Sequence, residues 1–484
     1  MKTRSHHKKR YAGRRWPAIV ACLLLGAALA SAQTPAEVNP LGQELNRLPP
    51  AFTGSVPAGK ASGTTIELTL RDALDLSLKQ NLGLIEDTQD IAGARAARVE
   101  ALSKLLPNIN GHITESVQQV NLAAFGLPRL PGVPQIVGPF SLSDARAALT
   151  QSVVDLSAWQ KERSASINQQ AARLSYADGR EIVVLVIADL YLEAVASSAR
   201  VDAAQSQLTT AQTTYDQAVN MRKAGIVAGI DVLRAQVELQ LRQQQLLAAR
   251  NRFAKDELDL ARAVGLPSGQ EFNLADKMPY APAPIVTLEK ALADAYAHRA
   301  DFQRAQALVR SAEASQRGAT AEYYPTLGIN GDYGDIGRTF GHSHGTFTAA
   351  ATLNIPIFQG NKVHADTLQA ESLVARRRAE LEDTRARVDS EVRKAFLDLQ
   401  AAADQVQVTS KERDLATETV TQARDRFAAG VANNLEVVQA QESLATANET
   451  YIDSVFAHNI AKASLARAVG LAERSIKEFL AEMH

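Results

Sequence analysis

The 484-residue sequence predicts an exported protein that is mainly α-helical with a small β part, and three patterns support this fold class. Aromatic residues make up only 5% of the chain, whereas alanine, glutamine and leucine are abundant, which favours long, closely packed helices. Apolar residues keep heptad spacing through stretches too long for an ordinary globular helix. Two shorter stretches alternate apolar and polar residues with period two, as strands do.

Residues 1–32 are predicted to be a secretory signal peptide rather than part of the fold. Seven lysines and arginines precede an apolar run from Ile19 to Ala30 and an Ala-Ser-Ala cleavage pattern. The run is shorter than the roughly 20 apolar residues that a membrane-spanning helix needs. Lipid attachment at Cys22 is a second interpretation, which would leave almost no apolar run before the cleavage site.

Charge and cysteine content argue against several classes of function. The formal net charge is −1, and acids exceed bases by eight once the basic leader is removed. This balance argues against a nucleic-acid partner. The only cysteine lies in the leader, so the mature chain is expected to have neither disulfides nor thiolate chemistry. Neither a nucleophile–base pairing nor zinc-ligand spacing is evident, so no enzyme activity and no cofactor are predicted.

The rest of the chain is predicted to contain an internal repeat. The hexapeptide Ala-Arg-Ala-Val-Gly-Leu occurs at residues 261–266 and again at 466–471, at the same offset as other matches upstream. A Pro/Gly/Ser-rich segment precedes the first copy, and a segment with four prolines separates the copies. The predicted divisions are a flexible lead-in (33–63), a first repeat (64–266), a linker (267–286), a second repeat (287–471) and a C-terminal tail (472–484).

Each repeat is expected to contain helices, a β hairpin and then a very long helix interrupted once. The first long helix, from about residue 160 to 222, would measure roughly 95 Å at 1.5 Å per residue. Its copy, from about 362 to 427, has a weaker heptad because Arg413 occupies an apolar position. The helices alone would also fit a coiled-coil rod. We call the heptad a and d positions, which are expected to face neighbouring helices, the seam positions. They are Ile187, Leu190, Ala194, Val201, Ala204, Leu208, Ala211, Tyr215 and Ala218, and in the copy Ala416, Val420, Ala423 and Phe427.

The hairpins are predicted at about 107–154 and 325–358. Residues 347–357 alternate over the length that a tilted membrane strand needs, whereas the strand expected at about 140–154, after a Pro/Gly-rich loop at 127–139, alternates poorly. Four strands cannot close a barrel, and each unpaired backbone group in lipid costs several kcal/mol. Copies of the chain are therefore expected to pool their strands, with the helices continuing the barrel as a tube.

These features resemble the outer-membrane efflux proteins of Gram-negative bacteria, the TolC-like outer-membrane factors, over about residues 64–471. Residues 222–236 and 426–441 resemble the family's helix-tip pattern. Residues 353–360 resemble the segment where the last strand turns into the long helix, and Val-Gly-Leu ends both halves.

The resemblance implies a homotrimer in outer-membrane lipid that extends into the periplasm. Its fold would be a TolC-like long α-helical barrel plus a transmembrane β-barrel, with four strands from each chain. It implies a channel of a tripartite efflux system that passes small solutes from an inner-membrane pump and a periplasmic adaptor to the outside. A duct for type I protein secretion has the same architecture. A periplasmic coiled-coil scaffold without a pore is the competing hypothesis from another class.

The candidate functional residues lie at the two predicted helix tips. Gly225 and Gly430 are expected to end the long helices in left-handed caps. Asp231 and Glu436 follow six residues later, where an acid either suits the helix dipole or contributes to a cation-attracting ring of three at the periplasmic mouth. The resemblance places a second mouth acid at the position of Gln439, so a weaker ring is expected.

The basic residues at the same tips are candidates for adaptor docking. Arg222 and Lys223 precede the first tip glycine, and Arg426 precedes the second. The family arginine that latches the closed mouth falls on Ala432, so the sequence predicts that this latch is missing.

Overall fold

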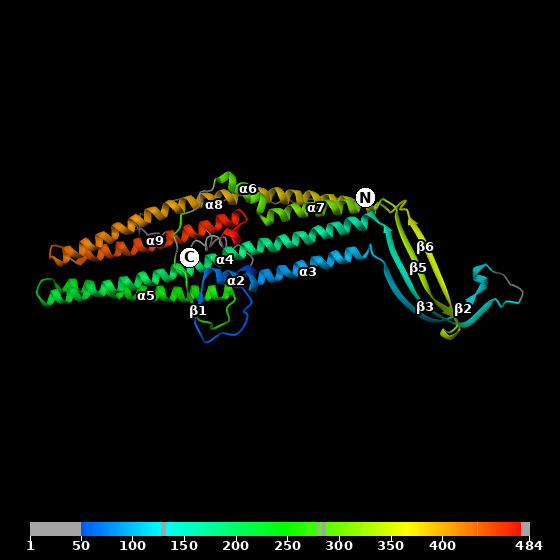
Figure 1. Cartoon of the computed structure of the whole chain (residues 1–484), viewed down its shortest axis with the longest axis horizontal. Coiled ribbons are helices and arrows are strands. Elements are labelled where there is room, and N and C mark those ends of the chain that lie inside the picture. Colours follow the sequence, from blue (N-terminus) through cyan, green and yellow to red (C-terminus); the bar gives the residue numbers. More distant parts are fainter. Residues whose placement is uncertain (1–49, 127–131, 278–279, 283–286, 433, 476–484) are drawn as a thin grey trace, which may run out of the picture.

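The computed structural model describes residues 50–126, 132–277, 280–282, 287–432 and 434–475. The chain is elongated, with long helices that continue at one end into a curved sheet (Figure 1). The predicted signal peptide with Cys22, the lead-in before residue 50 and the tail after residue 475 lie outside the described residues.

The helices follow the predicted repeat. Leu288 and Ala300 start helices 218 residues after the helices that begin at Leu70 and Leu82. The two long helices were predicted at about 160–222 and 362–427, and both are confirmed to within a few residues. The helices are α2 (Leu70–Gln80), α3 (Leu82–Ser103), α4 (Leu156–Lys223), α5 (Gly229–Val264), α6 (Leu288–His298), α7 (Ala300–Ala321), α8 (Lys362–Ala428) and α9 (Asn434–Ala468).

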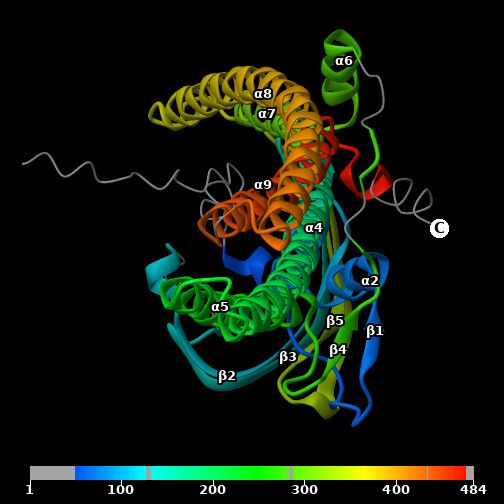
Figure 2. The ribbon, with the colours of Figure 1, turned by 90° about the vertical axis from the view of Figure 1, so that its left-hand side faces the viewer.

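The helices pair as two coiled coils, α4 with α5 and α8 with α9, and α4 also packs on α9. Viewed from the free end, they form a curved layer (Figure 2). None of the predicted seam residues is exposed. Arg413, which interrupts the second heptad, lies over the ring of Tyr451 with 4.1 Å between its guanidinium carbon and the ring centroid. A cation–π contact therefore accommodates the charge at an apolar position.

The four-stranded sheet is antiparallel throughout and has the order β2-β3-β5-β6. Within the described residues, β2 and β6 each pair with a strand on one side only. Short 3₁₀ helices lie at the ends of both hairpins. The elements are β2 (Asn108–Asn121), η2 (Leu122–Phe125), β3 (Ile136–Val154), β5 (Thr326–Gly337), η3 (Phe340–His342) and β6 (Ser343–Asn354).

Two strand boundaries differ from the prediction. The strand β3 begins at Ile136, inside the predicted loop 127–139, because Ile136 and Val137 pair with the end of β2; residues 127–131 lie outside the described part. Its alternation is weak because small residues occupy positions on its apolar side, where Ala145 pairs with Ile113 of β2 and Ala147 pairs with Tyr333 of β5. The strand β6 ends at Asn354 rather than at residue 357, since Pro356 has no N–H for the ladder.

The predicted flexible lead-in and the predicted linker both contain ordered segments. The 3₁₀ helix η1 (Pro50–Thr53) places Phe52 on the core, and the backbone N–H of Val56 donates to the oxygen of Gln80 at 2.8 Å. Within the linker, β4 (Phe272–Leu274) pairs in parallel with β1 (Ile66–Leu68). The sequence pattern missed this sheet because three-residue strands are too short to show alternation.

The main core surrounds the middle of α4. This helix has a stretch apolar enough for a membrane-spanning helix, but 72% of that stretch is buried inside the chain. It packs on α2, on the ends of α5 and α9 and on β1. Asp189 lies in this stretch, and its burial, together with the charge of Glu193, raises the pKa of its carboxyl group to about 7.

The recurring Val-Gly-Leu motif packs on the helix junction of its own half. Gly470 has φ +76°, and a Cβ there would lie 2.9 Å from the backbone of Arg299, which joins α6 to α7. Gly265, with φ +86°, lies against the end of α2 in the first half, where an added Cβ would meet the side chains of Gln80 and Ser55 rather than the backbone. The left-handed geometry favours glycine at both positions, and at Gly470 the close backbone contact requires it as well.

The junction in the second half also contains a buried cation. Arg299 is 2% exposed, and its guanidinium donates to Asp301 at 2.8 Å and to Glu391 of α8 at 2.6 Å. Asn81 occupies the equivalent place in the first half and caps α3. The two halves thus stabilise the same junction with different chemistry.

Replacing Arg299 by alanine is expected to lower the free energy of unfolding by about 3 kcal/mol, because the buried Asp301 would keep only the longer contact with the exposed Arg387 at 3.4 Å. The matched control is Arg393→Ala, whose exposed pair with Asp389 lies within α8 and is screened by solvent, so little change in stability is expected. Urea unfolding in detergent, followed by circular dichroism, measures both. Equal losses in the two variants would contradict a special role for the buried pair.

Candidate functional site

The sheet has a mainly apolar face, on which Glu115 and Asp335 lie in the half farther from the helices, and a polar face. The odd-numbered residues of β2 present Ile109, Ile113 and Val117 to solvent, each about 70% exposed or more. Tyr333 and Phe347 pair across β5 and β6 on the same face and are equally exposed. Exposed apolar side chains on alternate residues of neighbouring strands are typical of a lipid-facing surface.

The other face of the sheet is polar and contains a charged cluster. Arg146 of β3 donates to Asp144 at 2.7 Å and to Asp332 of β5 at 3.0 Å. These residues have even numbers and project from the face opposite to the apolar one, together with residues such as Asn110 and Asn330. Charges are tolerated at this depth only where the face lines water, which is the arrangement of a channel wall.

Exposed aromatic and apolar side chains lie at the end of the sheet where its strands join the helices; Figure 1 shows this junction. Tyr323 and Tyr324 lie between α7 and β5, and Trp159 lies in the first turn of α4. Ile357 and Phe358 lie between β6 and α8, and Phe358 is 84% exposed. Tyrosine and tryptophan are enriched at the boundary between lipid and water, so this belt indicates where a membrane surface would lie.

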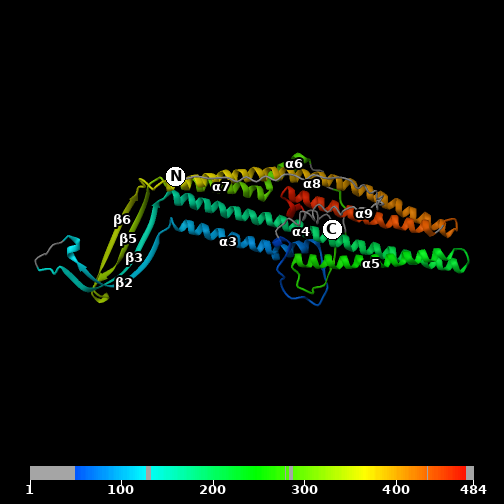
Figure 3. The ribbon, with the colours of Figure 1, turned by 180° about the vertical axis from the view of Figure 1, so that it is seen from behind.

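The predicted tip glycines end the long helices as expected. Gly225 and Gly430 have φ +75° and +72°. The N–H of Ile226 donates to Met221 at 2.9 Å, and that of Val431 donates to Arg426 at 3.0 Å, as in Schellman caps. Both tips lie at the end of the molecule opposite to the sheet (Figures 1 and 3).

The two predicted acids lie in the first turns of the returning helices, but their pairing differs. Asp231 contacts Arg234 of its own helix at 3.5 Å. Glu436 pairs with Arg426 across the turn at 3.0 Å, and Gln439 is exposed one turn later. The structure thus joins a predicted docking residue to a predicted mouth residue and partly neutralises the carboxylate.

The remaining basic candidates are exposed at the first tip. The guanidinium of Arg222 lies over Gly229, where an added Cβ would approach it to 3.1 Å, and Lys223 ends α4 in solvent. Arg222 therefore packs on the turn between α4 and α5 and also places a positive charge at this tip.

Sequence reasoning missed the residues that hold the two tips together. Asn434 is fully buried, and its side-chain amide donates to the backbone oxygen of Asp231 at 3.2 Å. Two turns farther from the tips, the side-chain amide of Gln441 in α9 donates to the hydroxyl of Thr214 in α4 at 3.1 Å. The only signal in the sequence was an amide at positions where the heptad favours an apolar residue.

A two-faced sheet, an aromatic belt and helices that extend far beyond it define the class of protein as an outer-membrane channel protein. The sequence model for the family "Outer membrane efflux protein" matches residues 73–266 and 291–471, which correspond to the two halves. The chain belongs to the outer membrane efflux protein family.

Curated relatives agree with this family. The chain is 23% identical over 348 residues to TtgC of Pseudomonas putida, a probable efflux pump outer membrane protein, covering 68% of this chain and 69% of TtgC. It is 21% identical over 349 residues to the alkaline protease secretion protein AprF of Pseudomonas aeruginosa, covering 69% and 71%.

Solved structures show the fold. The outer-membrane channel OprN superposes with a TM-score of 0.72 over 86% of this chain and 98% of that one, at 16% identity. The expected TolC-like fold, mainly α with a small β part, and the outer-membrane location are therefore confirmed.

Replacing Gly430 by alanine is expected to destabilise the tip by about 1–2 kcal/mol, because a Cβ there meets no neighbour and only the left-handed backbone is strained. Gly430→Asn should cost less, since asparagine tolerates this conformation. The measurement is hydrogen exchange at the end of α8. Gly341→Ala, at an open site without positive φ, is the control. Unchanged exchange in the alanine variant would contradict the cap.

Proposed function

We propose that the protein is the outer-membrane channel of a tripartite efflux system and works as a homotrimer with a periplasmic adaptor and an inner-membrane pump. The observation that carries the proposal is the two-faced four-stranded sheet with unpaired edges, joined to helices of 67 and 68 residues. No covalent chemistry is required, because the pump supplies the energy and the channel supplies a path.

The edges of the sheet support closure by copies of the chain. Edge backbone groups in lipid would each cost several kcal/mol, and membrane barrels begin at about eight strands. Three copies supply twelve strands, with β2 of one copy beside β6 of the next. Figures 1 and 3 show that α3 continues the β2 edge and α8 continues the β6 edge, so the same closure would join the helices.

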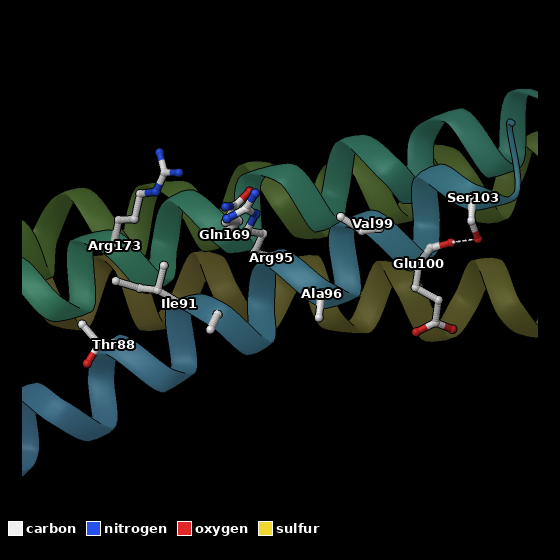
Figure 4. A pocket seen from close by; sticks show the side chains of 10 residues that line it. Thr88, Ile91, Arg95, Ala96, Val99, Glu100, Ser103, Gln169 and Arg173 are labelled. Carbon is white, nitrogen blue, oxygen red and sulfur yellow. Dashed lines mark hydrogen bonds between the residues drawn. The ribbon is translucent and has the colours of Figure 1, made fainter.

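A groove on the α3 edge supports the same arrangement. It lies between α3 and α4 and is lined mainly by apolar groups, including Ile91, Ala96 and Val99, with Arg173 at its border (Figure 4). Val99 is 57% exposed in the single chain. An apolar groove of about 790 Å³ on an edge that the sheet already requires to be covered fits a helix of a neighbouring copy.

The length of the helices supports a periplasmic role. The 68 residues of α4 span roughly 100 Å at 1.5 Å per residue. With the aromatic belt at the membrane surface, the tips would lie deep in the periplasm, within reach of an adaptor. Arg222, Lys223 and Arg426 beside the turns at Gly225 and Gly430 are the proposed docking residues.

The proposed mouth contains Asp231, Glu436 and Gln439 from each copy. Three copies of Glu436 would form a ring that attracts cations, although Arg426 reduces the charge of each member. The missing acid at position 439 weakens the ring further.

A type I secretion duct is the second candidate, and the similarity to the secretion protein AprF favours it. Deletion of the gene distinguishes the two functions. Increased sensitivity to dyes, drugs or metals supports efflux, whereas unchanged sensitivity with loss of a secreted protein supports secretion. A periplasmic scaffold without a pore would not explain the exposed apolar face of the sheet, so the structure favours a channel over a scaffold.

Replacing Val99 by glutamate is expected to abolish trimers, because a carboxylate in the groove between copies would lose its hydration at a cost of several kcal/mol, of which Arg95 and Arg173 in the same groove would offset only a part. Light scattering of the detergent-purified protein measures the molar mass. Val99→Ile keeps the groove apolar and should remain trimeric. A trimeric glutamate variant would show that this edge does not meet a neighbour.

Glu436→Gln is expected to weaken block of the single-channel current by a trivalent cation, whereas Arg426→Gln should strengthen it by exposing the carboxylate. Exposed pairs are worth about 0.2–1 kcal/mol, so shifts of about two- to fivefold in half-blocking concentration are expected. Gln439→Glu, which restores the second acid, should also strengthen block. Equal block in all variants would exclude the ring, and absence of conductance in planar bilayers would exclude the channel.

A further inference from the structure

A second groove, of about 430 Å³, lies between α4 and α8 near the tips. It extends from about one to four helical turns above the end of α8. Its floor is formed by α9 and by one residue of α5, so all four of its helices belong to one chain. Among the residues that line it are Arg242, Arg413 and Arg424, and none of the described lining residues is an aspartate or a glutamate.

The three guanidinium groups differ in how far they are compensated. Arg242 is 4% exposed and pairs with Glu238 at 2.6 Å, which holds it in place. Arg413 is held by the ring of Tyr451 and by the exposed Asp414 at 3.3 Å. Arg424 makes no hydrogen bond or ion pair with any residue in the described part of the chain. The excess positive charge of the groove is therefore that of Arg424, beside the held guanidinium groups of Arg242 and Arg413.

The rest of the lining is mixed in a way that suits an amphipathic ligand. Asn448 provides a side-chain amide, and Thr417 and Thr421 provide hydroxyl groups. Leu444 and Ile452 form an apolar wall beside the tyrosine ring. Ligand sites typically combine such a wall with a few convergent polar groups.

We propose that this groove binds small organic anions in which a carboxylate, phosphate or sulfonate group is attached to a short apolar body. Arg424 and Arg413 bind the acidic group, because guanidinium groups match the geometry of such oxyanions. Leu444, Ile452 and Tyr451 contact the apolar body. Since the site is complete within one chain, it does not depend on closure of the barrel or on the proposed transport function.

Calorimetric titration of the detergent-purified full-length protein with 1-naphthyl phosphate tests this site. The phosphate should bind, and neutral 1-naphthol, which keeps the apolar body, should bind far more weakly. Arg424→Gln should reduce affinity for the phosphate by about 10- to 100-fold, because hydrogen bonds to charged groups contribute about 1.5–3 kcal/mol. Arg413→Gln should reduce it as well.

The matched control is Lys411→Gln, which removes one positive charge from α8 at an exposed position outside the groove. It should bind the phosphate as the parent does. Equal binding of naphthol and naphthyl phosphate, or unchanged affinity in Arg424→Gln, would overturn the proposal. An equal loss in Lys411→Gln would also overturn it, since the effect would then be general electrostatic attraction. Channel conductance is measured separately, so failure here leaves the proposed function intact.

Discussion

The constraint on which the structure depends is that backbone polar groups in lipid must be hydrogen bonded. This chain provides only four antiparallel strands, with unpaired edges at β2 and β6 among the described residues. Each strand leads into a helix, so whatever completes the sheet also positions the helices. In the proposed trimer, closure of the barrel and closure of the helical tube are one event, and the apolar groove along α3 is covered in the same step.

Repetition of one unit explains how such a long structure is built from simple parts. Each half places a Gly-containing motif on its own helix junction, with Gly265 near Gln80 and Gly470 near Arg299. The two halves differ in the side chain that occupies this junction. One junction contains a neutral asparagine and the other a buried arginine with two carboxylates. A shared backbone therefore carries different side chains without a change in helix geometry.

Charge at the tips is mostly compensated within the chain. Arg426 pairs with Glu436 across its turn, and Arg234 lies beside Asp231. The groove above the tips differs, because its arginines meet no acid on the lining and Arg424 has no partner in the described chain. The uncompensated charge of Arg424 therefore lies about one turn above the end of α8 rather than at the proposed mouth.

The sequence by itself determined the features that arise from local periodicity. Heptads specified α4 and α8, alternation specified β5 and β6, and glycines specified the left-handed caps at both tips, because each pattern reflects the geometry of its own element. Tertiary structure decided what depends on distant contacts. The pairing of β1 with β4, the burial of Phe52 and the contact of Asn434 with Asp231 join segments far apart in the chain. Short strands and single buried amides have no period, so only packing specifies them.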